Sequence, residues 1–203
     1  MTGMTTHIGA FSVAQVQAAL LTRVNGAGPA TRPQAGHYAS IPEIKAAAKE
    51  LGSLHVRPAQ CVQATVLQAI VLDTGALGNA PAAIVNFKVG TNGVSEVLAA
   101  TANSAALASL SKPIPAGCAK YTAMSNGKAY HYAIQQFWVR GIGLQPARVL
   151  NIKSLDVKGN LWSVLYQGAG FIGTITVDGP DATEAAVREI AAQAYAYAAK
   201  ALS

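Results

Sequence analysis

The stretch 161-LWSVLYQGAGFIGTITVDGPDATEAAVREIAAQAYAYAAKAL-202 sets the architecture, because strand, turn, strand and helix signals follow one another along it. Residues 161–167 and 171–177 are rich in β-branched and aromatic side chains and flank Gly168-Ala169-Gly170, which predicts a β-hairpin. Asp181, with Glu184 three residues on, is expected to cap a following helix. Apolar residues then recur at helical spacing: Val187, Ile190, Ala191, Ala194, Ala198 and Leu202.

Strand signals also precede this hairpin. Residues 118–124, 129–139 and 147–157 each read as a strand, and residues 81–89 as one more. Ser125-Asn126-Gly127-Lys128 is a strong hairpin turn, since Asn-Gly readily takes the positive φ angles that a type I′ turn needs. We therefore expect an antiparallel meander of five or six strands.

Helices are expected before and between these strands. Ser12 begins a first short helix, and Ser40 forms a capping box with Glu43 at the start of a helix over residues 41–51. A further helix is expected over residues 58–70. The turn at residues 90–93 is expected to lead into a helix from Val94 to about Leu110, since its alanines favour helix.

The fold class is therefore α+β, with helices packed on an antiparallel sheet and the C-terminal helix covering it. At 203 residues the chain suits a single domain, which we place at residues 11–203 after a flexible tail at residues 1–10. A hydrophobic fraction of 51% with 12% charged residues is too apolar for disorder. Residues 1–10 show no signal peptide, so an exported protein would have lost its signal segment.

The net charge of +6 has one source, because residues 97–155 contain six basic residues and no acidic one. Such a surface attracts an anionic partner, or it is simply a solvated basic face of the sheet. The basic residues do not cluster and no nucleic-acid motif is present, which argues against nucleic acid.

Cys61 and Cys118 are too few for a structural zinc site and lack a CxxC spacing. They either pair, which requires an oxidising compartment, or remain two buried thiols of a cytosolic protein. A disulfide between positions 57 residues apart would stabilise the fold by ~4 kcal/mol in the chain-entropy model.

Two catalytic motifs fit their context poorly. Residues 168–173 match the GxGxxG dinucleotide fingerprint, but that motif opens a helix and here a strand follows, so a tight hairpin is favoured. Ser109 with Lys112, and Ser125 with Lys128, have the Ser-x-x-Lys spacing of an activated serine nucleophile. Their companion motifs are missing, so a serine hydrolase is kept only as an alternative.

No other group predicts catalysis or cofactor binding. The four histidines show no metal-binding spacing, and the carboxylates near the last helix are explained by its dipole. We expect no catalytic residue, no metal and no cofactor.

Aromatic residues on the strands are the candidate ligand-binding groups. Alternation puts Tyr130, Tyr132 and Trp138 on one strand face, while Trp162 and Tyr166 share a face of a later strand. Such rings either line a cleft for a glycan or lipid headgroup, with Lys128 and Arg140 supplying charge, or form the core under the helices.

The order of these segments resembles the PknH-like extracellular sensor domain family, known from a mycobacterial kinase and from exported lipoproteins. The likeness is carried by Pro58-Ala59-Gln60-Cys61, by residues 94–110 followed by Gly117-Cys118, and by the stretch quoted first. It implies that Cys61 and Cys118 form the family's first disulfide. Members often carry a second cysteine pair where this chain has Trp162-Ser163-Val164 and Ile175-Thr176-Val177, which favours the lipoprotein branch or a more distant relative.

The resemblance implies a non-enzymatic, extracytoplasmic binding or sensor domain in the cell envelope, either a lipoprotein or secreted. Its partner would be an anionic or amphiphilic small molecule, lipid or glycan of the envelope, with membrane association only through a lipid anchor that has been removed. A protein–protein interaction module is the second alternative.

Overall fold

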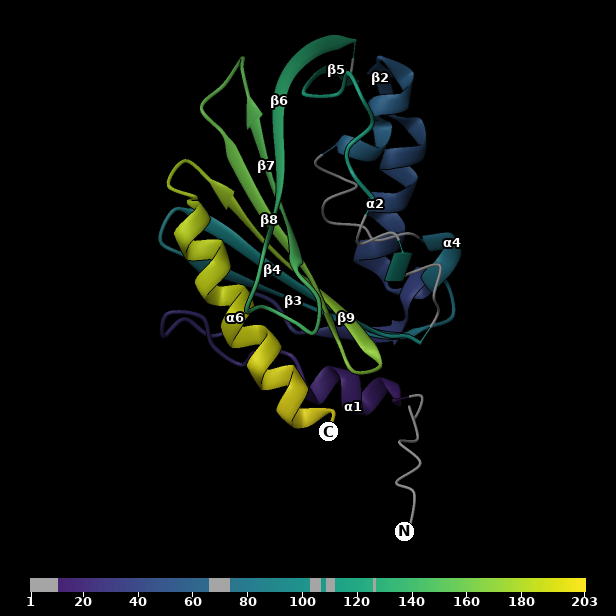
Figure 1. The fold of residues 1–203 in the computed structure, drawn as a ribbon, viewed down its shortest axis with the longest axis vertical. Coiled ribbons are helices and arrows are strands. Elements are labelled where there is room, and N and C mark those ends of the chain that lie inside the picture. The colour runs from purple at the N-terminus through teal and green to yellow at the C-terminus, as the bar shows by residue number, and fades with distance from the viewer. Residues whose placement is uncertain (1–10, 66–73, 103–106, 109–111, 126) are drawn as a thin grey trace.

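The computed structural model describes residues 11–65, 74–102, 107–108, 112–125 and 127–203. Within these residues one antiparallel sheet of nine strands has the order β1-β3-β4-β9-β8-β7-β6-β5-β2 (Figure 1). The strands are β1 Gln34–His37, β2 His55–Arg57, β3 Pro81–Val89, β4 Asn92–Ala100, β5 Lys120–Ser125, β6 Lys128–Val139, β7 Ala147–Ser154, β8 Asn160–Gly168 and β9 Phe171–Gly179.

The predicted meander is confirmed. β5 to β9 pair with their sequence neighbours, and Gly168 pairs with Phe171 across the β8–β9 turn, so the GxGxxG motif is a hairpin. Gly170 has φ +77°, which glycine adopts without the steric cost of a side chain. The described residues of the Asn-Gly turn likewise join β5 to β6, with Ser125 opposite Lys128.

The predicted helix from Val94 to about Leu110 is wrong over residues 94–100, whereas residues 107–108 are helical. Residues 92–100 form β4, which pairs with β3 on one side and β9 on the other. β4 is covered on both faces, so its buried residues run on continuously instead of alternating and mimic a buried helix. Tertiary pairing thus overrides the helix propensity of its alanines. The remainder of the predicted helix lies largely outside the described residues, as does the predicted tail.

The prediction of five or six strands is too low. Besides β4, it misses β1 and β2, which have four and three residues and form the two edges of the sheet. Edge strands this short carry too little alternation to be recognised.

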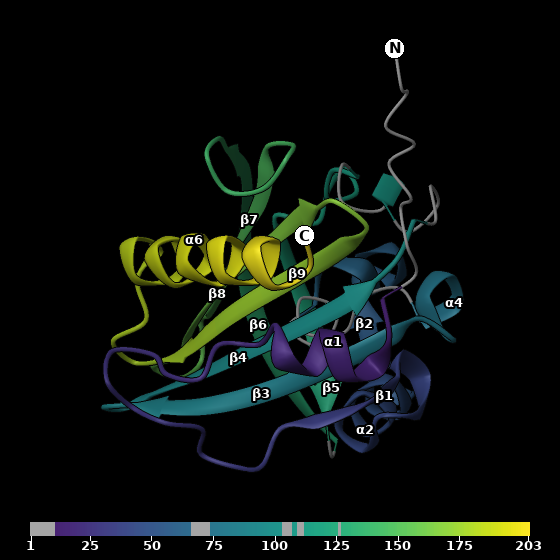
Figure 2. The same ribbon diagram turned by 90° about the horizontal axis from the view of Figure 1, so that it is seen from below.

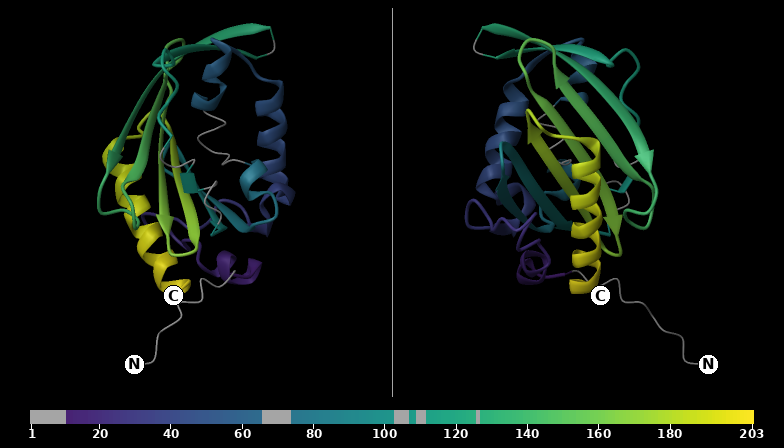
Figure 3. Two further views of the ribbon diagram at one scale, coloured as in Figure 1. Left: turned by 45° about the vertical axis from the view of Figure 1, so that its right-hand side comes forward. Right: turned by 90° about the vertical axis from the view of Figure 1, so that its left-hand side faces the viewer.

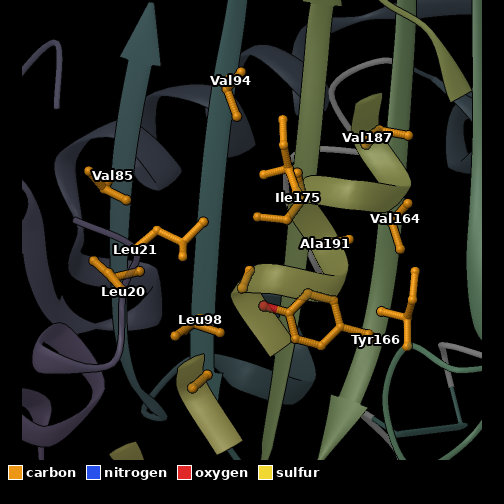
Figure 4. Packing of buried hydrophobic residues seen from close by; sticks show 14 of the residues in the cluster. Leu20, Leu21, Val85, Val94, Leu98, Val164, Tyr166, Ile175, Val187 and Ala191 are labelled. Carbon is orange, nitrogen blue, oxygen red and sulfur yellow. The ribbon is translucent and has the colours of Figure 1, made fainter. Parts of the chain in front are cut away.

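Two helices cover one face of the sheet, called here the α6 face. They are α1 Val13–Ala18 and α6 Glu184–Ala201, which lie over the strands in Figure 2. Figure 4 shows the core beneath them, in which Leu20 and Leu21 meet Leu98 of β4. Ser12 caps α1 as predicted, in a capping box with Gln15.

The predicted cap of α6 is wrong by two residues. The Thr183 hydroxyl accepts a hydrogen bond from the Ala186 amide and is the N-cap. Asp181 instead accepts a 2.6 Å hydrogen bond from the Thr91 hydroxyl, which ties the link before α6 to the β3–β4 turn.

The opposite face, called the α2 face, carries α2 Pro42–Ser53, α4 Thr74–Leu77 and the 3-10 turns η1 Tyr38–Ser40 and η2 Ala59–Ala64. Figure 3 shows α2 and α6 on opposite sides of the sheet. The predicted capping box of Ser40 is absent, because its hydroxyl donates to the His37 carbonyl and Ile41 is the N-cap. Glu43 instead accepts two 3.0 Å contacts from the Asn86 amide group, which fixes the start of α2 on β3.

Cys61 and Cys118 form a disulfide, as the family resemblance implied. Cys61 lies in η2 rather than in the longer predicted helix over residues 58–70, whose later part lies outside the described residues. Among the described residues, no helix is both long and apolar enough to cross a membrane.

Candidate functional site

A cavity of about 1440 Å³ lies on the α2 face, between the end of α2 and the strands β5 to β8. Among the described residues, α2 packs over β3, β4, β8 and β9, whereas η2 packs over β5, β6 and β7, and the cavity lies between them. The gap between these two apolar clusters falls over the middle of β7 and β8. The cavity is thus a consequence of how the sheet is covered.

The floor of the cavity is apolar. Leu150, Leu165 and Ile134 come from three adjacent strands and are each buried, and Leu51 and Val62 line the walls from α2 and η2. Alternation along β7 and β8 turns these leucines away from α6. A hydrocarbon chain could therefore pack against this floor.

The charged residues of the cavity are mainly cationic. Arg57, Lys112 and Arg148 line it, whereas Glu50 is its one carboxylate among the described residues. Arg148 projects from β7 beside the apolar floor, and burial lowers the pKa of its guanidinium below the ordinary value. The lowered pKa reflects the loss of part of the hydration of this positive charge.

The disulfide joins two walls of this cavity. Cys61 belongs to η2, whose Ala59, Val62, Gln63 and Ala64 line it, and Cys118 follows the lining segment 112–115. Both cysteines are buried. The bond therefore holds η2 and this segment at a fixed separation over β5 and β6.

The aromatic residues predicted from the sequence lie on opposite faces of the sheet. Trp162 and Tyr166 belong to the core of the α6 face, where the Trp162 ring contacts Phe137 at 6.4 Å between centroids and Tyr166 contacts Tyr195 of α6 at 5.9 Å. They are not together with the other three rings, so the seven predicted residues do not form one site.

Tyr130, Tyr132 and Trp138 alternate onto the α2 face. Tyr132 stacks on Tyr121 at 5.1 Å, and Trp138 is 44% exposed. Trp138 pairs across the strands with Arg148, which places it next to the cavity.

The two predicted basic residues lie at the ends of β6. Lys128 begins the strand, with Nζ 5.2 Å from the centroid of the Tyr130 ring, and Arg140 follows its last residue. Neither of them lines the cavity. Arg148 was not among the predicted site residues, although its place within a strand of apolar residues was a signal that could have identified it.

Geometry gives the pair of Ser125 and Lys128 little support. Ser125 and Lys128 face each other across the β5–β6 turn, and the ammonium group of Lys128 lies over Tyr130. Ser109 lies outside the described residues. Among the residues that the structure describes, no group of three or more His, Cys, Asp or Glu side chains could hold a metal ion.

Solved structures of two mycobacterial proteins are among those that resemble this chain. The extracellular domain of PknH from Mycobacterium tuberculosis matches with a TM-score of 0.57 and 11% identity, over 96% of this chain and 97% of that one. An uncharacterised protein from Mycobacterium smegmatis, the Rv0999 ortholog, matches with a TM-score of 0.46 and 13% identity, over 95% and 99%. No family model matches the sequence, and no curated protein matches it. The first match shows that the chain has the fold of the PknH extracellular domain, which confirms the resemblance at the level of fold.

Proposed function

We propose that this chain, which has the fold of the PknH extracellular domain, is an extracytoplasmic, non-enzymatic binding domain of the cell envelope. Its ligand is an anionic amphiphile, held with the charged group beside Arg148 and the hydrocarbon portion on Leu150 and Leu165. The cavity on the α2 face is the observation that carries this proposal.

Two observations support an extracytoplasmic location. Disulfides persist in oxidising compartments and are rare in the cytosol, and Cys61 and Cys118 form one here. The chain also shares its fold with a domain that is itself extracellular. A cell-envelope lipoprotein or a secreted protein would meet both conditions.

The chemistry of the cavity supports the ligand class. Ligand sites typically enclose about 300–1,000 Å³ and are mostly apolar, with a few polar groups that orient the ligand. This cavity is larger and combines an apolar floor with Arg57, Lys112 and Arg148. A phosphate or carboxylate with an attached alkyl chain satisfies both parts, whereas a cationic or purely polar molecule satisfies only one.

Fluorescence of Trp138 can test the proposal. The chain has two tryptophans, and replacing the core residue Trp162 with Phe leaves Trp138, the neighbour of Arg148, as the single reporter. In this background, monomeric dodecyl phosphate is expected to change the emission. Dodecyltrimethylammonium, with the same chain and the opposite charge, is expected to bind at least tenfold more weakly.

Matched arginine variants locate the anion. Hydrogen bonds to charged groups contribute about 1.5–3 kcal/mol, so Arg148→Gln is expected to weaken dodecyl phosphate binding at least tenfold. Arg140→Gln removes the same charge outside the cavity and is expected to leave binding unchanged. Equal binding of the two detergents, or an unaltered affinity in Arg148→Gln, would contradict the proposal.

A further inference from the structure

The turn between β7 and β8 exposes two aliphatic side chains together. Leu155 is 53% exposed and Val157 is 57% exposed, and they are separated by one residue. Turns favour Gly, Asn, Asp and Ser, so two exposed aliphatic residues in one short turn are unusual. Contact with an apolar partner would remove both side chains from water.

Hydrogen bonds hold this turn in a defined shape. The Leu155 amide donates to the His131 carbonyl at 2.8 Å, and the Ser154 hydroxyl accepts from the Val157 amide at 3.3 Å. The Asp156 carboxylate accepts from the His131 amide, and one of its oxygens lies 3.0 Å from Nδ1 of His131. The aliphatic side chains are thus presented by an ordered turn.

Positive charge surrounds the two aliphatics. Lys153 and Lys158 flank them in sequence, and both are exposed. Lys128 adds a third ammonium from the start of β6, beside the Tyr130 ring. The one carboxylate of this turn, Asp156, is engaged by His131.

We propose that this tip, residues 153–158 with Lys128, docks the protein onto an anionic lipid bilayer. Leu155 and Val157 enter the acyl boundary while the three lysines contact anionic headgroups, as in other interfacial segments. Two aliphatic side chains are too small an area for a stable protein interface, but a deformable bilayer can accept a protruding turn.

The place of the tip in the fold agrees with this occupant. The β7–β8 turn leaves the sheet at the same end as the β5–β6 turn, whose Ser125 and Gly127 line the cavity (Figure 1). Docking would bring that rim of the cavity toward the bilayer. Membrane binding does not depend on an occupied cavity, so it can succeed or fail independently of the proposed function.

Vesicle sedimentation tests the contact. The full chain is mixed with sucrose-loaded vesicles of phosphatidylcholine alone or with 30% phosphatidylglycerol, at about 0.1 M and 0.5 M NaCl. We expect binding only to the phosphatidylglycerol vesicles, weakened at high salt because surface charges are screened. Leu155→Ser with Val157→Ser is expected to reduce it at least tenfold. Lys153→Gln with Lys158→Gln should cost about fivefold per lysine.

Matched variants at other surface positions distinguish binding through the tip from nonspecific binding to vesicles. Leu144→Ser removes an aliphatic that is 57% exposed in the β6–β7 turn, and Lys45→Gln with Lys49→Gln removes two exposed lysines from α2. Both are expected to bind as the unaltered chain does. Absence of binding to phosphatidylglycerol vesicles, equal binding to pure phosphatidylcholine, or a loss as large in these controls would overturn the proposal. Thermal melts confirm that each variant is folded.

Discussion

The backbone amide of Leu21 donates a 2.8 Å hydrogen bond to Oε2 of Glu96, a carboxyl group that is wholly buried on the α6 face of β4. This bond ties the segment after α1 to the centre of the sheet. Burial raises the pKa of Glu96 to about 8, which outweighs the lowering by the Leu21 amide. At neutral pH the carboxyl is therefore mostly protonated in the folded protein.

The raised pKa of Glu96 predicts that stability falls as pH rises. In the unfolded chain the carboxyl ionises near 4.5, whereas the folded chain keeps its proton to about 8, so its contribution is complete below the first value and is lost toward the second. The expected slope in this window is about 1.4 kcal/mol per pH unit. Between pH 5 and 7.5 this corresponds to a decrease in Tm of roughly 6–14 °C.

Glu96→Gln provides the control, since Gln keeps the acceptor for Leu21 and cannot ionise. Its Tm is expected to be nearly constant from pH 5 to 8 and to exceed that of the unaltered chain at pH 7.5. Asp156 does not interfere, because hydrogen bonds from His131 lower its pKa below 3.8, and its contribution is lost only as pH falls through that lower value. Parallel pH profiles in the two proteins would show that Glu96 is not responsible.

Gly173→Ala is expected to destabilise the fold by about 1–3 kcal/mol. The Tyr166 ring lies over Gly173, its cross-strand partner, and an added Cβ would lie 2.3 Å from Cζ of that ring. The reference is Gly52→Ala in α2, where an added Cβ meets nothing within 4 Å. Urea unfolding is expected to show little change or a slight stabilisation there.

Combining Gly173→Ala with Tyr166→Leu tests the cause. The smaller side chain leaves room for the new methyl group, so the double variant is expected to lose less than the sum of the single changes. Additive losses would mean that the tyrosine ring is not what excludes a side chain at position 173.

Replacing both Cys61 and Cys118 with Ser is expected to lower the free energy of unfolding by about 4 kcal/mol, since it frees a loop spanning 57 residues in the unfolded chain. It should also weaken binding in the cavity, because η2 and the segment 112–115 are no longer joined. Urea unfolding and dodecyl phosphate titration measure the two effects. Reduction of the unaltered protein should reproduce both.

A fluorophosphonate probe is expected to leave the serines unmodified. The ammonium group of Lys128 lies over the Tyr130 ring, an arrangement that does not favour activation of Ser125 as a nucleophile. Mass spectrometry after labelling covers Ser109 as well. Labelling of one serine, abolished by Ser125→Ala or by Ser109→Ala, would support the hydrolase alternative instead.

Local chemistry accounts for the parts of the fold that were predicted correctly. The β8–β9 hairpin, the Asn-Gly turn and the spacing of apolar residues in α6 follow from turn residues and periodicity within a few positions. β4 was predicted as a helix because it is covered on both faces, so its alanine and valine residues do not alternate with polar residues. The candidate site was harder, since Arg148 and Leu165 meet only through strand register.

The antiparallel hairpins, helix α6 and the excess of positive charge could be predicted from the sequence alone, because each depends on neighbouring residues or on composition. The family resemblance drawn from it also supplied the cysteine pair. The positions of Trp162 and Tyr166 beneath α6, and of Trp138 beside Arg148, depend on tertiary packing and could not be predicted from the sequence. Alternation assigns residues to two faces, but which face is covered depends on where α2, η2 and α6 pack. The cavity between α2, η2 and the strands of the α2 face therefore exists only in the assembled sheet.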